Sequence, residues 1–64
     1  MRSFDIEQLE NILRAGRQHG ASWDEVEALV LATAARMRRS LGGRPSEAEV
    51  MALLQHWRRE FPAS

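Results

Sequence analysis

The chain has 64 residues, in which nine arginines balance nine acidic residues and in which lysine and cysteine are absent. This length allows one domain, residues 1–64, near the lower limit for an apolar core without support, and the lack of cysteine excludes a disulfide. Zero formal charge argues against strong non-specific binding to nucleic-acid phosphates, and no apolar run approaches a membrane span or signal peptide. We therefore expect a soluble, cytoplasmic protein.

The first predicted helix covers residues 5–18. Asp5 is a suitable N-cap with Gln8 three residues later, and Phe4 can pack on Leu9 as a hydrophobic staple. One face of this helix is apolar or small at helical spacing and consists of Ile6, Leu9, Ile12, Leu13 and Gly16. We expect this face to be buried.

Two glycines shape the end of the first helix. Gly16 lies on the apolar face, where it either lets a neighbouring segment come close or weakens the last turn. Gly20 is the expected residue after the C-cap, where a left-handed backbone favours glycine. Because only Ala21 then precedes the next predicted helix, that helix must turn back sharply against the first.

The middle helix, predicted for residues 22–41, is the longest of the three. Ser22 can cap it by accepting a hydrogen bond from the backbone N–H of Glu25, whose carboxylate can reach back to the N–H of Ser22. Its apolar stripe repeats every three to four residues and contains Trp23, Val26, Val30, Thr33, Met37 and Leu41. This stripe is expected to face the core.

A second stripe lies about half a turn from the first, where a solvent-facing helix normally carries charge. It consists of Ala28, Leu31, Ala32 and Ala35. Alanine is the best helix former, so helix propensity alone is one explanation of this stripe. The other explanation is a docking surface, because small residues let a second helix approach closely around Leu31.

The charges beside the second stripe suit a two-fold axis. If an identical helix packed antiparallel about Leu31, Asp24 would lie opposite the partner's Arg38, because each is seven residues from Leu31. We therefore expect Asp24 and Arg38 to join the second stripe in the interface of a homodimer.

Residues 42–45, with the sequence GGRP, interrupt the helical pattern, and a third helix is predicted for residues 46–61. Ser46 and Glu49 can form another capping box, and Pro62 stops the helix. The apolar stripe of this helix contains Val50, Leu53, Leu54, Trp57 and Phe61.

The stripes of the three helices predict an all-α fold, a compact three-helix bundle. Its expected core contains Phe4, Ile6, Leu9, Ile12, Leu13, Trp23, Val26, Leu29, Val30, Met37, Leu41, Val50, Leu53, Leu54, Trp57 and Phe61. Such a core is small for a chain without disulfides, so association with a partner would supply further burial.

Catalytic, cofactor-binding and metal-binding patterns are absent from the sequence. Neighbouring acids such as Glu47 and Glu49 lie in the first turn of a predicted helix, where carboxylates suit the helix dipole and stay solvated. His19 and His56 lie in different helical regions without metal-ligand spacing and without a nucleophile placed beside them. We expect no enzyme, no cofactor, no metal and no small-molecule substrate.

Charge is distributed unevenly along the chain. Residues 1–35 contain six acids and three arginines, whereas residues 36–64 contain six arginines and three acids, which gives −3 and +3. The arginines of the second half form a candidate basic patch across the end of the bundle: Arg36, Arg38, Arg39, Arg44, Arg58 and Arg59. Arginines near helix C-termini also complement the helix dipole, which is a sufficient structural explanation for several of them.

A DNA-binding regulator of helix-turn-helix type is the alternative function, since three short helices with a turn before the third fit that pattern. The third helix would enter the major groove with Glu47 and Glu49 at its tip, where carboxylates oppose phosphate binding. Gln55, His56 and Arg59 would then be the candidate base-reading residues on its outer face.

The sequence favours a small non-enzymatic protein-interaction module, acting as an adaptor, inhibitor or regulator. Its expected partner is another protein, a second copy of the chain, or both, with nucleic acid as the alternative. Membrane-surface binding is opposed by the acidic first half, which would be repelled by anionic headgroups. Arginine without lysine, together with abundant alanine, is typical of GC-rich genomes, and we expect a small bacterial or phage protein.

Overall fold

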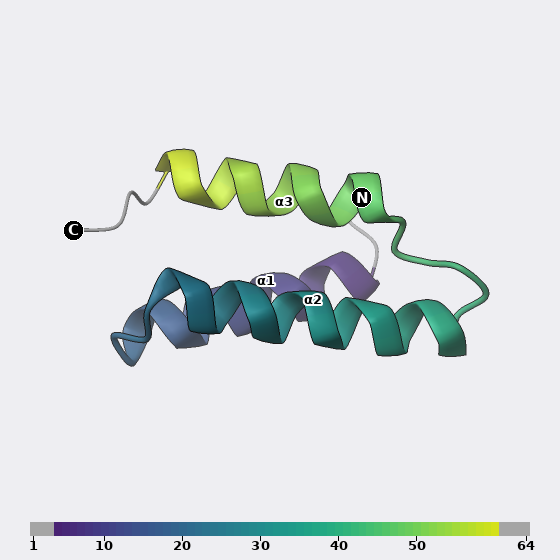
Figure 1. Cartoon of the computed structure of the whole chain (residues 1–64), viewed down its shortest axis with the longest axis horizontal. Coiled ribbons are helices and arrows are strands. Elements are labelled where there is room, and N and C mark those ends of the chain that lie inside the picture. The colour runs from purple at the N-terminus through teal and green to yellow at the C-terminus, as the bar shows by residue number, and fades with distance from the viewer. Residues whose placement is uncertain (1–3, 61–64) are drawn as a thin grey trace.

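The protein is an up-down-up bundle of three α-helices. The structure, a computed structural model, describes residues 4–60, in which α1 spans Phe4–Gln18, α2 spans Trp23–Ser40 and α3 spans Glu47–Glu60 (Figure 1). The predicted all-α fold is confirmed, and α2 is the longest helix of this part of the chain, with 18 residues. The predicted boundaries that fall within residues 4–60 agree within one residue, which is the usual scatter of helix ends, and the predicted end of the third helix at residue 61 lies outside the described residues.

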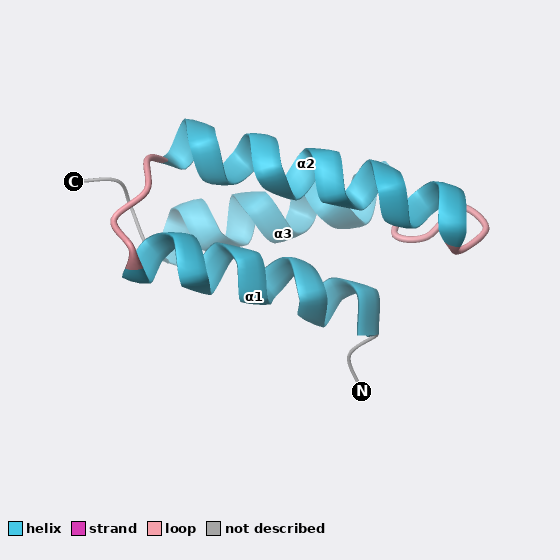
Figure 2. Ribbon diagram, turned by 90° about the horizontal axis from the view of Figure 1, so that it is seen from below, coloured by secondary structure: helices cyan, strands magenta, loops and turns pink. Residues whose placement is uncertain are grey.

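Helices α1 and α2 lie side by side in one layer, and α3 lies on one side of this layer, across both helices, as Figures 1 and 2 show together. The described chain measures 36 × 20 × 17 Å, which fits two layers of helices, each about 10 Å thick. The contact between α1 and α2 is the most extensive of the helix pairs. The layer of α1 and α2 therefore forms the base on which α3 packs.

A Schellman motif ends α1 and sets the sharp turn into α2. The backbone N–H of Ala21 donates to the carbonyl of Gly16 at 2.9 Å, and that of Gly20 donates to the carbonyl of Arg17 at 3.3 Å. Gly20 has a φ of 73°, which confirms its predicted role after the C-cap. Helix α2 is followed in the same way by Gly42, whose φ is 67°.

Gly16 brings α1 and α2 into close contact. A Cβ atom at this position would lie 2.5 Å from Cγ2 of Val26 in α2. Carbon atoms normally approach no closer than about 3.5 Å, so a larger residue would displace Val26. Of the two roles predicted for Gly16, the structure supports close approach of a neighbouring helix.

The predicted capping box of α3 is present, and at α2 the predicted cap by Ser22 is present. The backbone N–H of Glu25 donates to Oγ of Ser22 at 3.3 Å. At α3 the bonds are reciprocal, because the N–H of Glu49 donates to Oγ of Ser46 at 3.2 Å while the N–H of Ser46 donates to the Glu49 carboxylate at 3.4 Å. These bonds satisfy backbone donors that a helix start otherwise leaves unpaired.

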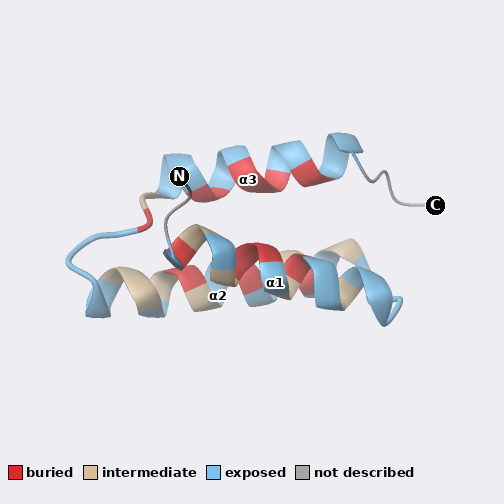
Figure 3. Ribbon diagram, turned by 180° about the vertical axis from the view of Figure 1, so that it is seen from behind, coloured by how far each residue is buried: buried red, intermediate tan, exposed pale blue. Residues whose placement is uncertain are grey.

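An apolar core fills the space between the three helices, and Figure 3 shows buried residues where the helices face one another. Within residues 4–60, nine apolar side chains of the helices are buried, and all but Ala34 were predicted: Leu9, Leu13, Val26, Val30, Ala34, Val50, Leu53, Leu54 and Trp57. Pro45, in the loop before α3, is also buried and was not predicted. Four further predicted core residues pack against them and are partly buried: Ile6, Ile12, Trp23 and Met37.

Three predicted core residues lie at the surface instead. Phe4 is 71% exposed, Leu29 is 52% exposed and Leu41 is 41% exposed. Phe4 begins α1 and Leu41 follows the end of α2, so neighbouring helices do not enclose them. A hydrophobic staple requires Phe4 to precede the helix, whereas Phe4 lies within α1, so the predicted staple of Phe4 on Leu9 is wrong. The prediction for Phe61 lies outside the described residues.

Some buried positions are small or charged and escaped prediction from apolar periodicity. Ala34 is 1% exposed, and the acids Asp5 and Glu10 are 6% and 7% exposed. Asp5 lies inside the first turn of α1, so its predicted role as N-cap is wrong. Within residues 4–60 every buried side-chain nitrogen and oxygen has a hydrogen-bond partner, which offsets the cost of burying these carboxylates.

Candidate protein-binding face

Four of the predicted binding residues lie on the side of α2 that faces away from the core. Ala28, Leu31 and Ala32 are exposed and Ala35 is half-buried, with 43% of Leu31 open to solvent. We call these four residues the outer face of α2. Apart from the adjacent Leu31 and Ala32, they are three, four or seven residues apart, so they form one stripe along the helix.

The outer face belongs to an uncharged segment in the middle of α2. Residues 28–35 contain no charged side chain, and Val30 and Ala34 are the two among them that are buried. A helix that is apolar around its whole circumference is normally enclosed on all sides. Leu29, expected in the core, is half-exposed and adds to the apolar surface on the side of α1.

Charged residues lie on both sides of this uncharged segment. Asp24, one of the predicted binding residues, is exposed. Arg38 is half-buried, and its Nε–H donates to the backbone carbonyl of Pro45 at 3.0 Å, so Arg38 is engaged within the chain. Arg39 is exposed and follows Ala35 by four residues. The charged residue that continues the stripe of the outer face is therefore Arg39 and not the predicted Arg38.

One edge of α2 is joined to α3. The Arg58 guanidinium forms a salt bridge with the Glu27 carboxylate and lies over the ring of Trp23, with Cζ 5.9 Å from the ring centroid. Leu31 is one turn after Glu27 and lies near this edge of α2. Met51 is two turns before Arg58 on α3 and is 46% exposed. The exposed apolar surface therefore extends from α2 towards α3.

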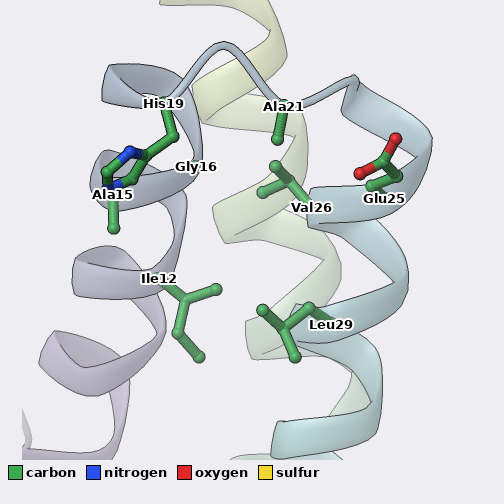
Figure 4. A pocket seen from close by; sticks show the side chains of 8 residues that line it. All are labelled: Ile12, Ala15, Gly16, His19, Ala21, Glu25, Val26 and Leu29. Carbon is green, nitrogen blue, oxygen red and sulfur yellow. The ribbon is translucent and has the colours of Figure 1, made fainter.

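A groove of about 390 Å³ lies between α1 and α2 beside their connection (Figure 4). Ile12 and Leu29 point towards each other across it from the two helices, and His19 and Glu25 are its polar lining residues. The remaining lining residues are Ala15, Gly16, Ala21 and Val26. The sequence did not reveal this groove because Ile12 and Leu29 were both expected inside the core.

The structure separates the candidate basic patch into two groups. Arg36 and Arg39 lie near the end of α2 and Arg44 in the following loop, whereas Arg58 and Arg59 lie in the last turn of α3. Because α2 and α3 run antiparallel, these groups lie at opposite ends of the bundle (Figure 1). A single patch across one end of the bundle is therefore not formed.

The arrangement of α2 and α3 also differs from that of a DNA-binding helix-turn-helix. In that motif two helices cross at about 90–120° and are joined by a turn of about 3–4 residues. Here the two helices are nearly antiparallel and are joined by the longer segment 41–46 (Figure 1). In addition, Arg36 bonds to the hydroxyl of Thr33 and Arg58 to Glu27, so both guanidinium groups have partners within the chain.

Between residues 4 and 60, no group of three or more His, Asp or Glu side chains is arranged to hold a metal ion, and His19 and His56 are both exposed. No helix in this range is long and apolar enough to cross a membrane. Comparison of the chain with protein-family models, curated proteins and solved structures finds no match.

Proposed function

We propose that this protein is a small protein-interaction module, an adaptor, inhibitor or regulator, which binds another protein through the outer face of α2. The observation that carries the proposal is the exposure of Leu29 and Leu31, at 52% and 43%, within a segment that has no charge. Single exposed leucines are common on protein surfaces. Here Leu31 lies on the outer face with the exposed Ala28 and Ala32, and Leu29 adds apolar surface on the side of α1, so a partner on α2 can cover more than a single leucine.

The size of this area favours a protein over a small molecule as the partner. Burying a leucine completely contributes roughly 1.5–3 kcal/mol, so covering the exposed halves of Leu29 and Leu31 contributes about 1.5–3 kcal/mol together. This corresponds to roughly a ten- to hundredfold gain in affinity. A partner must supply further contacts around the outer face, which a protein surface can do. The proposal assigns no catalytic step to the chain.

A charge placed in the middle of the outer face tests this function. Ala32→Arg leaves the core unchanged, because Ala32 is exposed. We expect proteins that are recovered with the tagged wild-type chain to be lost from this variant. Ala52→Arg, at an exposed alanine of α3, is the matched control and should retain them. Recovery of the same proteins with both variants would refute the proposal.

A further inference from the structure

The charges of α2 point to a second copy of this chain as the partner. We propose that two copies pack the outer faces of α2 against each other in antiparallel orientation, with a two-fold axis between Leu31 and Ala32. The pairing rests on the function proposed above and names the occupant of the same surface. It requires that the two helices be complementary in charge and in shape when one is reversed.

Charge complementarity selects the antiparallel orientation. The exposed charges near the outer face are Asp24 and Glu25 at the start of α2, and Arg36 and Arg39 near its end. The bond of Arg36 to the neutral hydroxyl of Thr33 leaves its positive charge uncompensated. In an antiparallel pair the acidic start of each helix faces the arginine end of the other. In a parallel pair acids would face acids and arginines would face arginines, which is unfavourable.

The structure also sets the register of the pair. Glu27 is paired with α3 and Arg38 is bonded to the loop after α2, so neither charge is free for a second molecule. Asp24 is therefore expected opposite the partner's Arg39, which is exposed, instead of the partner's Arg38. The two-fold axis therefore lies between Leu31 and Ala32, half a residue beyond the axis at Leu31 that the sequence predicted.

The same axis places large side chains opposite small ones. Leu31 lies opposite the partner's Ala32, and Ala28 lies opposite the partner's Ala35, because the members of each pair are equally distant from the axis. Alanine at a contact lets helices approach to the short end of the usual range of about 8–10 Å. Leu31 of each copy then packs among the small residues of the other helix.

The dimensions of α2 indicate a weak, reversible dimer. The segment from Asp24 to Arg39 is about 24 Å long and an α-helix is about 10 Å wide, so each copy contributes on the order of a few hundred Å². Stable complexes bury about 800 Å² per partner. We therefore expect dimerisation at micromolar concentrations and weaker dimerisation at high salt, because the charges involved are exposed.

Charge reversal tests the pair of Asp24 and Arg39 by sedimentation equilibrium. Asp24→Arg or Arg39→Asp alone turns the two attractive contacts of the dimer into repulsive ones. We expect each variant alone to dimerise roughly tenfold more weakly than wild type, and an equimolar mixture to regain the wild-type affinity within about threefold. Circular dichroism verifies that both variants are folded.

Disulfide cross-linking tests the orientation independently, because the chain has no cysteine of its own. In the proposed dimer, the cysteine of Ala28→Cys lies opposite the partner's residue 35. The two cysteines in a pair of Ala28→Cys chains are instead about 10 Å apart along the helix axis. Cysteines bridge only when their Cα atoms lie within about 7 Å. We expect a mixture of Ala28→Cys and Ala35→Cys to form a disulfide heterodimer on mild oxidation, and neither protein to cross-link with itself.

Three results would overturn the pairing: a wild-type monomer at high micromolar concentration, charge-reversed variants that dimerise like wild type, or preferential cross-linking of Ala28→Cys with itself. The function proposed above can fail or survive separately. If the chain is monomeric and Ala32→Arg still loses a different protein, the outer face of α2 binds that protein and the second copy is excluded as its occupant.

Discussion

Substitution of Gly16 by alanine tests how closely α1 and α2 pack. The added Cβ would lie 2.5 Å from Cγ2 of Val26, while Cγ1 and Cβ of Val26 would be 3.5 and 3.6 Å away. One methyl group of Val26 must therefore move. This is difficult because Val26 is only 7% exposed and because a valine in a helix has one strongly preferred rotamer.

Two opposing contributions set the expected change in the free energy of unfolding. Replacing glycine by alanine inside a helix stabilises a protein by about 1 kcal/mol, whereas overpacking a core costs about 1–3 kcal/mol. The steric contribution is the larger, so we expect Gly16→Ala to destabilise the protein by about 1 kcal/mol. For a domain of this size the melting temperature would fall by about 4–8 °C.

A double-mutant cycle with Val26→Ala isolates this contact. In the Val26→Ala background both methyl groups are absent, and the new Cβ meets the Cβ of residue 26 at 3.6 Å, which is an ordinary contact. Gly16→Ala should therefore stabilise that background by about 1 kcal/mol, which gives a coupling energy of about 2 kcal/mol. Urea unfolding of the four proteins, followed by circular dichroism, measures both values. Equal stabilisation by Gly16→Ala in the two backgrounds would refute the close packing of α1 on α2.

Two other substitutions test the start of α3 and the orientation of α2. Ser46→Ala should lower the free energy of unfolding by about 1 kcal/mol in urea titrations, because it removes the acceptor for the N–H of Glu49. Ser40→Ala, at the exposed end of α2, is the control and should change the free energy of unfolding by less than about 0.5 kcal/mol. Ala34→Leu should cost about 1–3 kcal/mol in thermal melts, because Ala34 is 1% exposed, whereas Ala32→Leu at an exposed position should not. Equal losses from Ala34→Leu and Ala32→Leu would contradict the observed orientation of α2.

The helices and their ends were predictable because the interactions that define them are local. Ser22, Ser46 and Gly20 each act through hydrogen bonds to residues no more than a few positions away, so their roles can be recognised from neighbouring residue types. Apolar periodicity likewise identified eight of the nine buried apolar residues of the helices, since each helix needs one apolar side to pack. An all-α bundle with α2 as its longest helix follows from these local signals.

The assignment of particular side chains to core or surface depended on contacts between distant segments. Periodicity identifies a broad apolar arc, but the positions of α1 and α3 decide that Ala34 is enclosed while Leu29 is half-exposed. In the same way, the path of the loop after α2 engages Arg38 and leaves Arg39 exposed. The antiparallel arrangement of α2 and α3 likewise places Arg58 at the far end of the bundle from Arg39. Spacing along one helix specifies an angle around its axis, whereas exposure and pairing depend on which other helices occupy that angle.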